Sequence, residues 1–284
     1  VDWSRERFTL DDGLSDAVQE VFIRLHEKKL IYRGKKLVNW DTQLKTAVSD
    51  LEVVNEETHG QIWYIRYPLE NNSSSDIIVA TTRPETLFGD VAIAVHPDDP
   101  RYQKYLGKKA IIPLTERTIT IIADEHVNPE FGTGAVKVTP AHDFNDYEIG
   151  QRHSLPLINI MNPDGTLNKE VPPSFQGMDR LVARKSIVSE LKTQSFITEI
   201  KAHKHIIPKG DRSKTVLEPM LTDQWYVDAK SMAKPAKSCS ERGIRFGRDE
   251  LERMKKTFRC DFVEHIDLSN SKIVNVMLFA RLSQ

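Results

Sequence analysis

The sequence has 284 residues, of which 39% are hydrophobic and 29% are charged, the composition of an ordinary globular protein. Lys and Arg total 40 against 41 for Asp and Glu, so the overall charge does not attract nucleic acid or membranes, and such a partner would need a local basic patch. The two cysteines, Cys239 and Cys260, form neither a CxxC pair nor a disulfide framework. No apolar run reaches the roughly 18 residues of a membrane helix.

These features predict a cytoplasmic protein with no membrane segment. The N-terminus, Val1–Arg7, lacks an initiator Met and the basic and apolar regions of a signal peptide, so we expect the sequence to be part of a longer chain. We expect no bound metal, because His203, His205, His265 and the two cysteines lack the spacing of metal ligands.

Apolar residues at helical spacing predict a helix over residues 14–29. The next segment, 30–40, has the pattern of two short strands around Gly34. Residues 61–68 and 77–81, joined by a polar loop at 71–75, predict a β-hairpin. Further strands are expected at 91–95, 110–112, 118–123, 132–139 and 197–207, and helices at 98–105 (one or two turns), 143–152 and 179–193. Many short strands with few long helices predict an α+β or mostly-β domain over about 55–205.

A polar run follows the strand that ends near Ala80. Hydroxyl, guanidinium and carboxylate side chains gather within six residues: Thr81, Thr82, Arg83, Glu85 and Thr86. Pro84 disfavours helical backbone at the preceding residue and suits the first turn of a helix. The pattern predicts a strand that ends at a polar pocket, followed by a helical turn whose N–H groups face a ligand. Threonine-rich strand ends and proline turns also occur without any function.

A second polar run lies about fifty residues later, at 131–146. Gly132 and Gly134 permit unusual backbone angles or the close approach of a ligand. In the strand that follows, Lys137 and Thr139 are two residues apart and therefore face the same side. Asp143 and Asp146 lie three apart at the start of the next predicted helix, so they share a face and can converge on one ligand.

Each of these side chains also has an ordinary structural explanation. Asp143 can be only the N-cap of its helix, Lys137 can be a surface charge, and His142 fits a turn residue better than a catalyst. Taken together, however, a cation, two carboxylates, a hydroxyl and bare backbone suit a small zwitterionic ligand.

The two runs resemble one family of proteins when they are set side by side. TTRPETLFGD (81–90) with AVHPDD (94–99), and FGTGAVKVTPAHD (131–143) with DYEIG (146–150), are similar to the editing domain that valyl-tRNA synthetases carry inside their class I catalytic fold. Isoleucyl relatives have a different dipeptide after the threonine run, and leucyl relatives lack KVT before PAHD. The resemblance extends from about Asp2 to about Phe246.

The resemblance implies an α+β fold in which a β-barrel-like editing domain with short helices occupies residues 55–205. It implies that the flanks are remnants of the Rossmann-type catalytic domain. Residues 1–54 would end its first half, and residues 206–246 would lead back towards it. Residues 247–284 are expected to be a divergent tail of unknown fold, in which the sequence pattern predicts a charged helix after Gly247.

Site residues follow from the same resemblance. Arg83, Phe131, Lys137 and Thr139 would line the editing site, with Phe131 packed on the terminal adenine of the tRNA. Asp143 would hold the α-ammonium group of the substrate, and Asp146 would bind the threonine hydroxyl. The expected catalytic residues are Lys137, Thr139 and Asp143, and the expected substrate-binding residues are Thr82, Arg83, Thr86, Phe131, Asp143 and Asp146.

The implied activity is hydrolysis of the ester in threonyl-tRNA(Val), carried out by a monomer. No HIGH-type or KMSKS-type run occurs in the sequence, so ATP and Mg are expected only in the full-length ligase and no cofactor is expected for editing. The alternative is a catalytically silent fragment that binds tRNA or another partner. For tRNA, the densest basic patch is Lys201, Lys204, Lys209, Arg212 and Lys214, which fits a solvated charged loop equally well.

Overall fold

The computed structural model describes residues 6, 8, 10–70, 72–229 and 231, and the side chains of all of these except 72–75. Cys239, Cys260, His265 and the helix expected after Gly247 lie outside the described residues. Residues 36–222 form one compact unit, and the described residues among 1–35 and 223–284 belong to a second.

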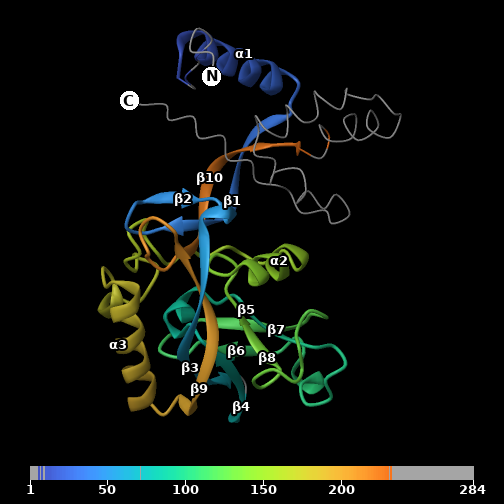
Figure 1. The fold of residues 1–284 in the computed structure, drawn as a ribbon. Coiled ribbons are helices and arrows are strands. Elements are labelled where there is room, and N and C mark those ends of the chain that lie inside the picture. Colours follow the sequence, from blue (N-terminus) through green and yellow to red (C-terminus); the bar gives the residue numbers. More distant parts are fainter. Residues whose placement is uncertain (1–5, 7, 9, 71, 230, 232–284) are drawn as a thin grey trace. The chain divides into compact units, whose positions relative to one another are not determined.

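Most of the strands are short, apart from two long ones (Figure 1). The helices are α1 (Asp12–Glu27), α2 (Phe144–Arg152) and α3 (Arg180–Thr193), with 3₁₀ turns η2 (Asp50–Glu52), η3 (Pro84–Gly89), η4 (Gln103–Tyr105) and η5 (Pro173–Phe175). The strands are β1 (Ile31–Asp41), β2 (Thr46–Val48), β3 (Val53–Leu69), β4 (Asn72–Thr81), β5 (Ala92–Val95), β6 (Lys109–Ile111), β7 (Thr118–Ala123), β8 (Ala135–Val138), β9 (Ile197–Gly210) and β10 (Glu218–Val227).

A seven-stranded sheet organises the 36–222 unit, in the order β4-β3-β6-β7-β5-β8 with β9 added to β3. The pairs are antiparallel except β5 with β7, which is parallel. Strands β4 and β8 stand at the two ends of this order and yet contact each other, so the sheet curls into a half-barrel. The predicted α+β, barrel-like class is therefore confirmed. A separate three-stranded sheet has the order β10-β1-β2.

The core of this unit lies inside the curled sheet and beneath α3. Ile65, Tyr67 and Ile93 are fully buried there. Helix α3 begins at its N-cap Asp179, whose carboxylate accepts two main-chain N–H groups, and it packs against η3 and β9. Because η3 contains the second half of the TTRPETLFGD run, from Pro84 to Gly89, this packing fixes one wall of the candidate site.

The structure corrects several predicted boundaries. Strand β1 is continuous through Gly34, where two strands were expected, and residues 72–75, predicted as a loop, extend β4. Gly132 and Gly134 do not begin β8 but form the turn before it, with φ of +60° and +77°, angles that favour glycine. Residues 98–105 contain only the η4 turn. Strands β3 and β9 are longer than the sequence pattern predicts, because they pair with each other from Val53 opposite Gly210 to Ile65 opposite Ile197.

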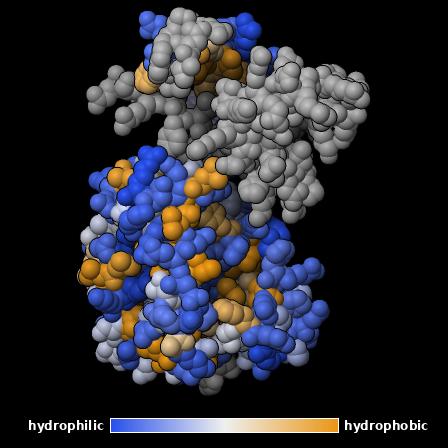
Figure 2. Space-filling model, in the orientation of Figure 1, coloured by the Kyte–Doolittle hydropathy of each residue, from blue (hydrophilic) through white to orange (hydrophobic). Residues whose placement is uncertain are grey.

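The second unit packs mainly through rings. Phe22 of α1 meets Trp225 edge-on with 5.3 Å between ring centroids, and Tyr32 stacks on Tyr226 at 5.7 Å. Among the residues described here, no helix is both long and apolar enough to cross a membrane. On the visible face of the 36–222 unit, hydrophobic residues lie in separate groups among hydrophilic ones (Figure 2).

Helix α3 offers a test of the packing described above. Leu191 is fully buried, whereas Leu181 on the same helix is 42% exposed. Leu191→Ala should lower the free energy of unfolding by roughly 2–5 kcal/mol, because it removes buried methyl groups and leaves a cavity. The matched control Leu181→Ala should change it by less than about 0.5 kcal/mol. Urea unfolding monitored by circular dichroism measures the free energy of unfolding of both variants. Equal decreases in the two variants would contradict the packing of α3.

Candidate functional site

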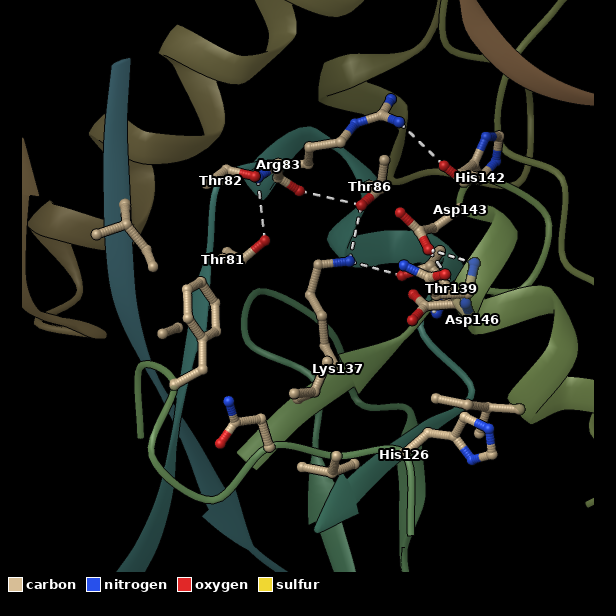
Figure 3. A pocket seen from close by; sticks show the side chains of 18 of the residues that line it. Thr81, Thr82, Arg83, Thr86, His126, Lys137, Thr139, His142, Asp143 and Asp146 are labelled. Atoms are coloured by element: carbon tan, nitrogen blue, oxygen red, sulfur yellow. Dashed lines mark hydrogen bonds between the residues drawn. The ribbon is translucent and has the colours of Figure 1, made fainter. Parts of the chain in front are cut away.

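The two polar runs meet in one open pocket of about 600 Å³. Figure 3 shows it between the end of β4 with η3 on one side and β8 with the start of α2 on the other. All eight residues predicted to be catalytic or to bind substrate line this pocket: Thr82, Arg83, Thr86, Phe131, Lys137, Thr139, Asp143 and Asp146. The fold thus brings the predicted residues together, while their individual roles remain predictions.

Lys137 lies at the centre of a buried network (Figure 3). Its Nζ donates to the hydroxyls of Thr139 at 2.6 Å and Thr86 at 2.7 Å and to the carboxylate of Asp90 at 2.9 Å. Asp90 also accepts the hydroxyls of Thr139 at 2.6 Å and Tyr67 at 2.7 Å. Because an ammonium group has three N–H donors, Lys137 has none left for a ligand. Its geometry is that of a group that positions the two threonines.

Asp143 and Asp146 come from the first turn of α2. Asp143 is the N-cap, since its Oδ1 accepts the main-chain N–H groups of Asn145 at 2.8 Å and Asp146 at 3.1 Å. Asp146 is buried, and its Oδ2 accepts the N–H of Thr139 at 2.7 Å. Burial and the neighbouring Asp143 raise the pKa of Asp146 to about 7. One oxygen of each carboxylate stays outside these bonds, so two acceptors can face one ligand.

Arg83 is held in place by acidic partners. Its guanidinium binds Glu85 at 3.1 Å, donates to the main-chain oxygen of His142 at 2.9 Å and pairs with Glu218. Burial acts to raise the pKa of Glu85, but Arg83 and Arg184 overcome this effect and lower the pKa to about 2. Three of the five N–H groups of Arg83 are used in these contacts, which leaves two for a ligand.

His142 is a structural residue in this geometry. It is buried, and its Nε2 accepts the main-chain N–H of Ile160 at 3.0 Å. Burial, together with the nearby Arg83 and Lys137, lowers the pKa of His142 to about 3. A neutral imidazole whose Nε2 is already occupied suits an anchor for the 160 segment rather than a general base.

The basic patch is locally neutralised. Four of its five members pair with glutamates, most of which come from β3 or the η2 turn just before it: Lys201 with Glu199 at 2.9 Å, Lys204 with Glu57 at 3.0 Å, Lys209 with Glu56 at 2.5 Å and Arg212 with Glu52 at 2.5 Å. Between residues 201 and 214 of the sequence, Asp211 is the one acidic residue. The pairing of β9 with β3 supplies the missing acids, so the patch has less free charge for tRNA than its composition indicates.

Sequence reasoning missed two buried acids beside the pocket. Asp90 and Glu85 have no exposed surface, and both lie in the TTRPETLFGD run without a role having been assigned to them. Lys137 could have indicated such an acid, since a lysine on a buried strand requires a counter-ion. Among the described residues, no group of three His, Cys, Asp or Glu side chains is arranged to hold a metal ion.

Comparisons with known proteins point in one direction. The family model "tRNA synthetases class I (I, L, M and V)" matches residues 1–261. The chain is 57% identical over 243 residues to "Valine--tRNA ligase" of Coxiella burnetii, covering 86% of this chain and 26% of that protein. It is 56% identical over 247 residues to "Valine--tRNA ligase" of Legionella pneumophila (strain Paris), covering 87% and 27%.

The chain spans about a quarter of the length of these curated relatives. Among solved structures, the ternary complex of Agrobacterium radiobacter K84 agnB2 LeuRS, tRNA and LeuAMS matches 72% of this chain and 34% of that chain. Its TM-score of 0.40 and identity of 19% are too low to carry an argument. Because the family match extends over most of the sequence and both relatives are valine–tRNA ligases, the chain belongs to the class I tRNA synthetase family (I, L, M and V), with a sequence of the valyl type.

Proposed function

We propose that the pocket hydrolyses the ester of threonyl-tRNA(Val), as the editing site of a valine–tRNA ligase. The observation that carries this proposal is the pair of carboxylates at the start of α2. Asp143 and Asp146 each keep an oxygen for a ligand, in a pocket that Arg83 also borders. Two acceptors suit the ammonium and hydroxyl groups of a threonyl ester. Charging of tRNA with valine, and the ATP and Mg that it needs, belong to our proposal for the full-length ligase.

Such an enzyme needs a second site for a physical reason. A hydrophobic valine pocket does not strongly reject threonine, which is nearly isosteric. Valyl-tRNA synthetases as a class are the general example of this limit, since their synthetic site prefers valine over threonine by only about a hundredfold. An editing site must therefore recognise the hydroxyl itself. Asp146 would accept a hydrogen bond from the hydroxyl of threonine, and valine would leave this buried carboxylate without that partner.

The proposed reaction needs one water molecule and no covalent enzyme intermediate. The water oxygen bonds to the ester carbon, the bond from that carbon to the ribose oxygen breaks, and a proton passes to the ribose oxygen. Asp143 would hold the substrate ammonium group. The two N–H groups of Arg83 outside its ion pairs can stabilise the developing oxyanion, and Lys137 would keep Thr86 and Thr139 in position without touching the ester.

The alternative proposal is a catalytically silent fragment that only binds tRNA. The meeting of both polar runs in one pocket favours editing over that alternative, whereas the local neutralisation of the basic patch reduces the free positive charge available for tRNA in either case. Incubating the chain with threonyl-tRNA(Val) separates the two: hydrolysis above the spontaneous rate supports editing, and binding without hydrolysis supports the silent fragment.

The carboxylate of Asp143 can be tested apart from its capping role. Asn caps helices about as well as Asp, so Asp143→Asn should preserve the start of α2 while removing the charge that binds the ammonium group. We expect deacylation of threonyl-tRNA(Val) to fall at least about tenfold, the effect of roughly 1.4 kcal/mol, with little change in melting temperature. Single-turnover hydrolysis and thermal denaturation are the measurements. Wild-type activity in this variant would remove Asp143 from the site.

Asp146 should control selectivity more than rate. In Asp146→Asn, the side-chain oxygen can still accept the N–H of Thr139, but the charged acceptor for threonine is lost. The ratio of threonyl-tRNA(Val) to valyl-tRNA(Val) hydrolysis should therefore fall by about tenfold or more. Glu116→Gln, which is exposed and lies outside the pocket lining, serves as the control. An unchanged ratio in Asp146→Asn would assign recognition to another group.

The raised pKa of Asp146 predicts a pH-dependent selectivity. With a pKa of about 7, the carboxyl is mostly protonated at pH 6 and mostly ionised at pH 8. Because the ionised form is the stronger acceptor, the preference for the threonyl ester should increase between these pH values. The preference of Asp146→Asn should stay level once spontaneous ester hydrolysis is subtracted. A level profile in the wild type would contradict the role given to this carboxylate.

A further inference from the structure

Three rings form a row along the rim of the pocket. Phe131 meets His203 edge-on with 6.0 Å between ring centroids, and His203 lies parallel to His205 at 6.1 Å with only 8° between their planes. All three residues line the pocket. Phe131 is 51% exposed, and the two histidines are half-buried. A row of aromatic rings that is open to solvent in this way can accept further flat groups.

The strand register shows that the row is built into one face of the β3–β9 ribbon. Gly60 lies opposite His203, and Thr58 lies opposite His205, so both histidines project from the same face. A Cβ atom at Gly60 would lie 2.2 Å from Cε1 of His205. The missing side chain of Gly60 therefore lets the His205 ring lie against β3. His59, paired with Lys204, faces the opposite side.

The size of the pocket determines what must lie on this rim. A pocket of about 600 Å³ holds a ligand of roughly drug-like size, which is comparable to one aminoacylated nucleoside. If that nucleoside is the end of a tRNA, the chain continues out of the pocket, and the nucleotide before it must cross the rim. Unpaired bases stack on Phe and His rings, and half-exposed imidazoles suit a base better than a purely apolar partner.

We propose that His203 and His205 continue from Phe131 as a stacking track for the unpaired nucleotide that precedes the terminal one, while Phe131 keeps its expected place beside the terminal adenine. The inference rests on the proposed function, because that function supplies the single-stranded 3′ end as the ligand. It assigns His203 and His205 a role in holding RNA that is separate from the chemistry at Asp143 and Asp146. The contact is stacking rather than charge neutralisation, so it does not require the basic patch to be free.

The experiment uses the whole chain and a short unacylated single-stranded RNA that ends like tRNA(Val), with 2-aminopurine as its penultimate base. Stacking quenches the fluorescence of this base. We expect quenching with the wild type, and at least about a fivefold weaker Kd for the double variant His203→Ala, His205→Ala, since stacking contributes about 1–3 kcal/mol per base. His203→Tyr should retain the quenching. His59→Ala, on the opposite face, should bind like the wild type.

A second variant keeps both histidines and displaces one ring. Gly60→Ala should push His205 off β3 and weaken quenching, although by less than the double variant. Unchanged affinity and quenching in the double variant, or no quenching by the wild type, would overturn the stacking track. Hydrolysis of threonyl-tRNA(Val) is measured separately. Quenching without hydrolysis would reject the editing proposal alone, and hydrolysis without quenching would reject the track alone.

Discussion

The buried pair of Lys137 and Asp90 joins the two walls of the pocket. Its Nζ and Oδ1 atoms are 2.9 Å apart, and both side chains are almost completely shielded from water. Removing one partner of such a pair typically costs about 3–5 kcal/mol, because the other charge is left buried and unpaired. The pair also holds the hydroxyls of Thr86 and Thr139. The positions of η3 and β8 relative to each other therefore depend on this contact.

This arrangement divides the work of the site between two sets of charged groups. Lys137 and Arg83 are committed largely to internal partners, whereas the carboxylates of α2 keep acceptor oxygens for a ligand. A polar network that satisfies its members is rigid, and a rigid wall helps the carboxylates to discriminate between two ligands that differ by one hydroxyl group. In our proposal, selectivity comes from the cost of leaving Asp146 without a partner. Lys137 keeps the site in shape, and Arg83 also donates to the developing oxyanion.

The β3–β9 ribbon shows how pairing can change the meaning of a sequence pattern. The lysines of β9 look like a nucleic-acid patch when they are counted along the chain. Antiparallel pairing sets glutamates of β3 beside two of them, and charge-neutralised pairs on a surface contribute little attraction. The same register places His203 and His205 on one face next to Gly60. In our proposal, that face contacts RNA through rings rather than through charge.

The sequence by itself determined the α+β class, most of the short strands, the α3 helix and the N-cap Asp143, because these depend on side-chain periodicity and on contacts within a few residues. It also placed the eight candidate site residues in two runs whose resemblance to one family was specific. Only the tertiary structure decided which groups pair. Lys137 meets Asp90 across 47 residues and Thr86 across 51, and Arg83 meets Glu218 across 135. Such partners follow from strand order and sheet curvature, which no local pattern specifies.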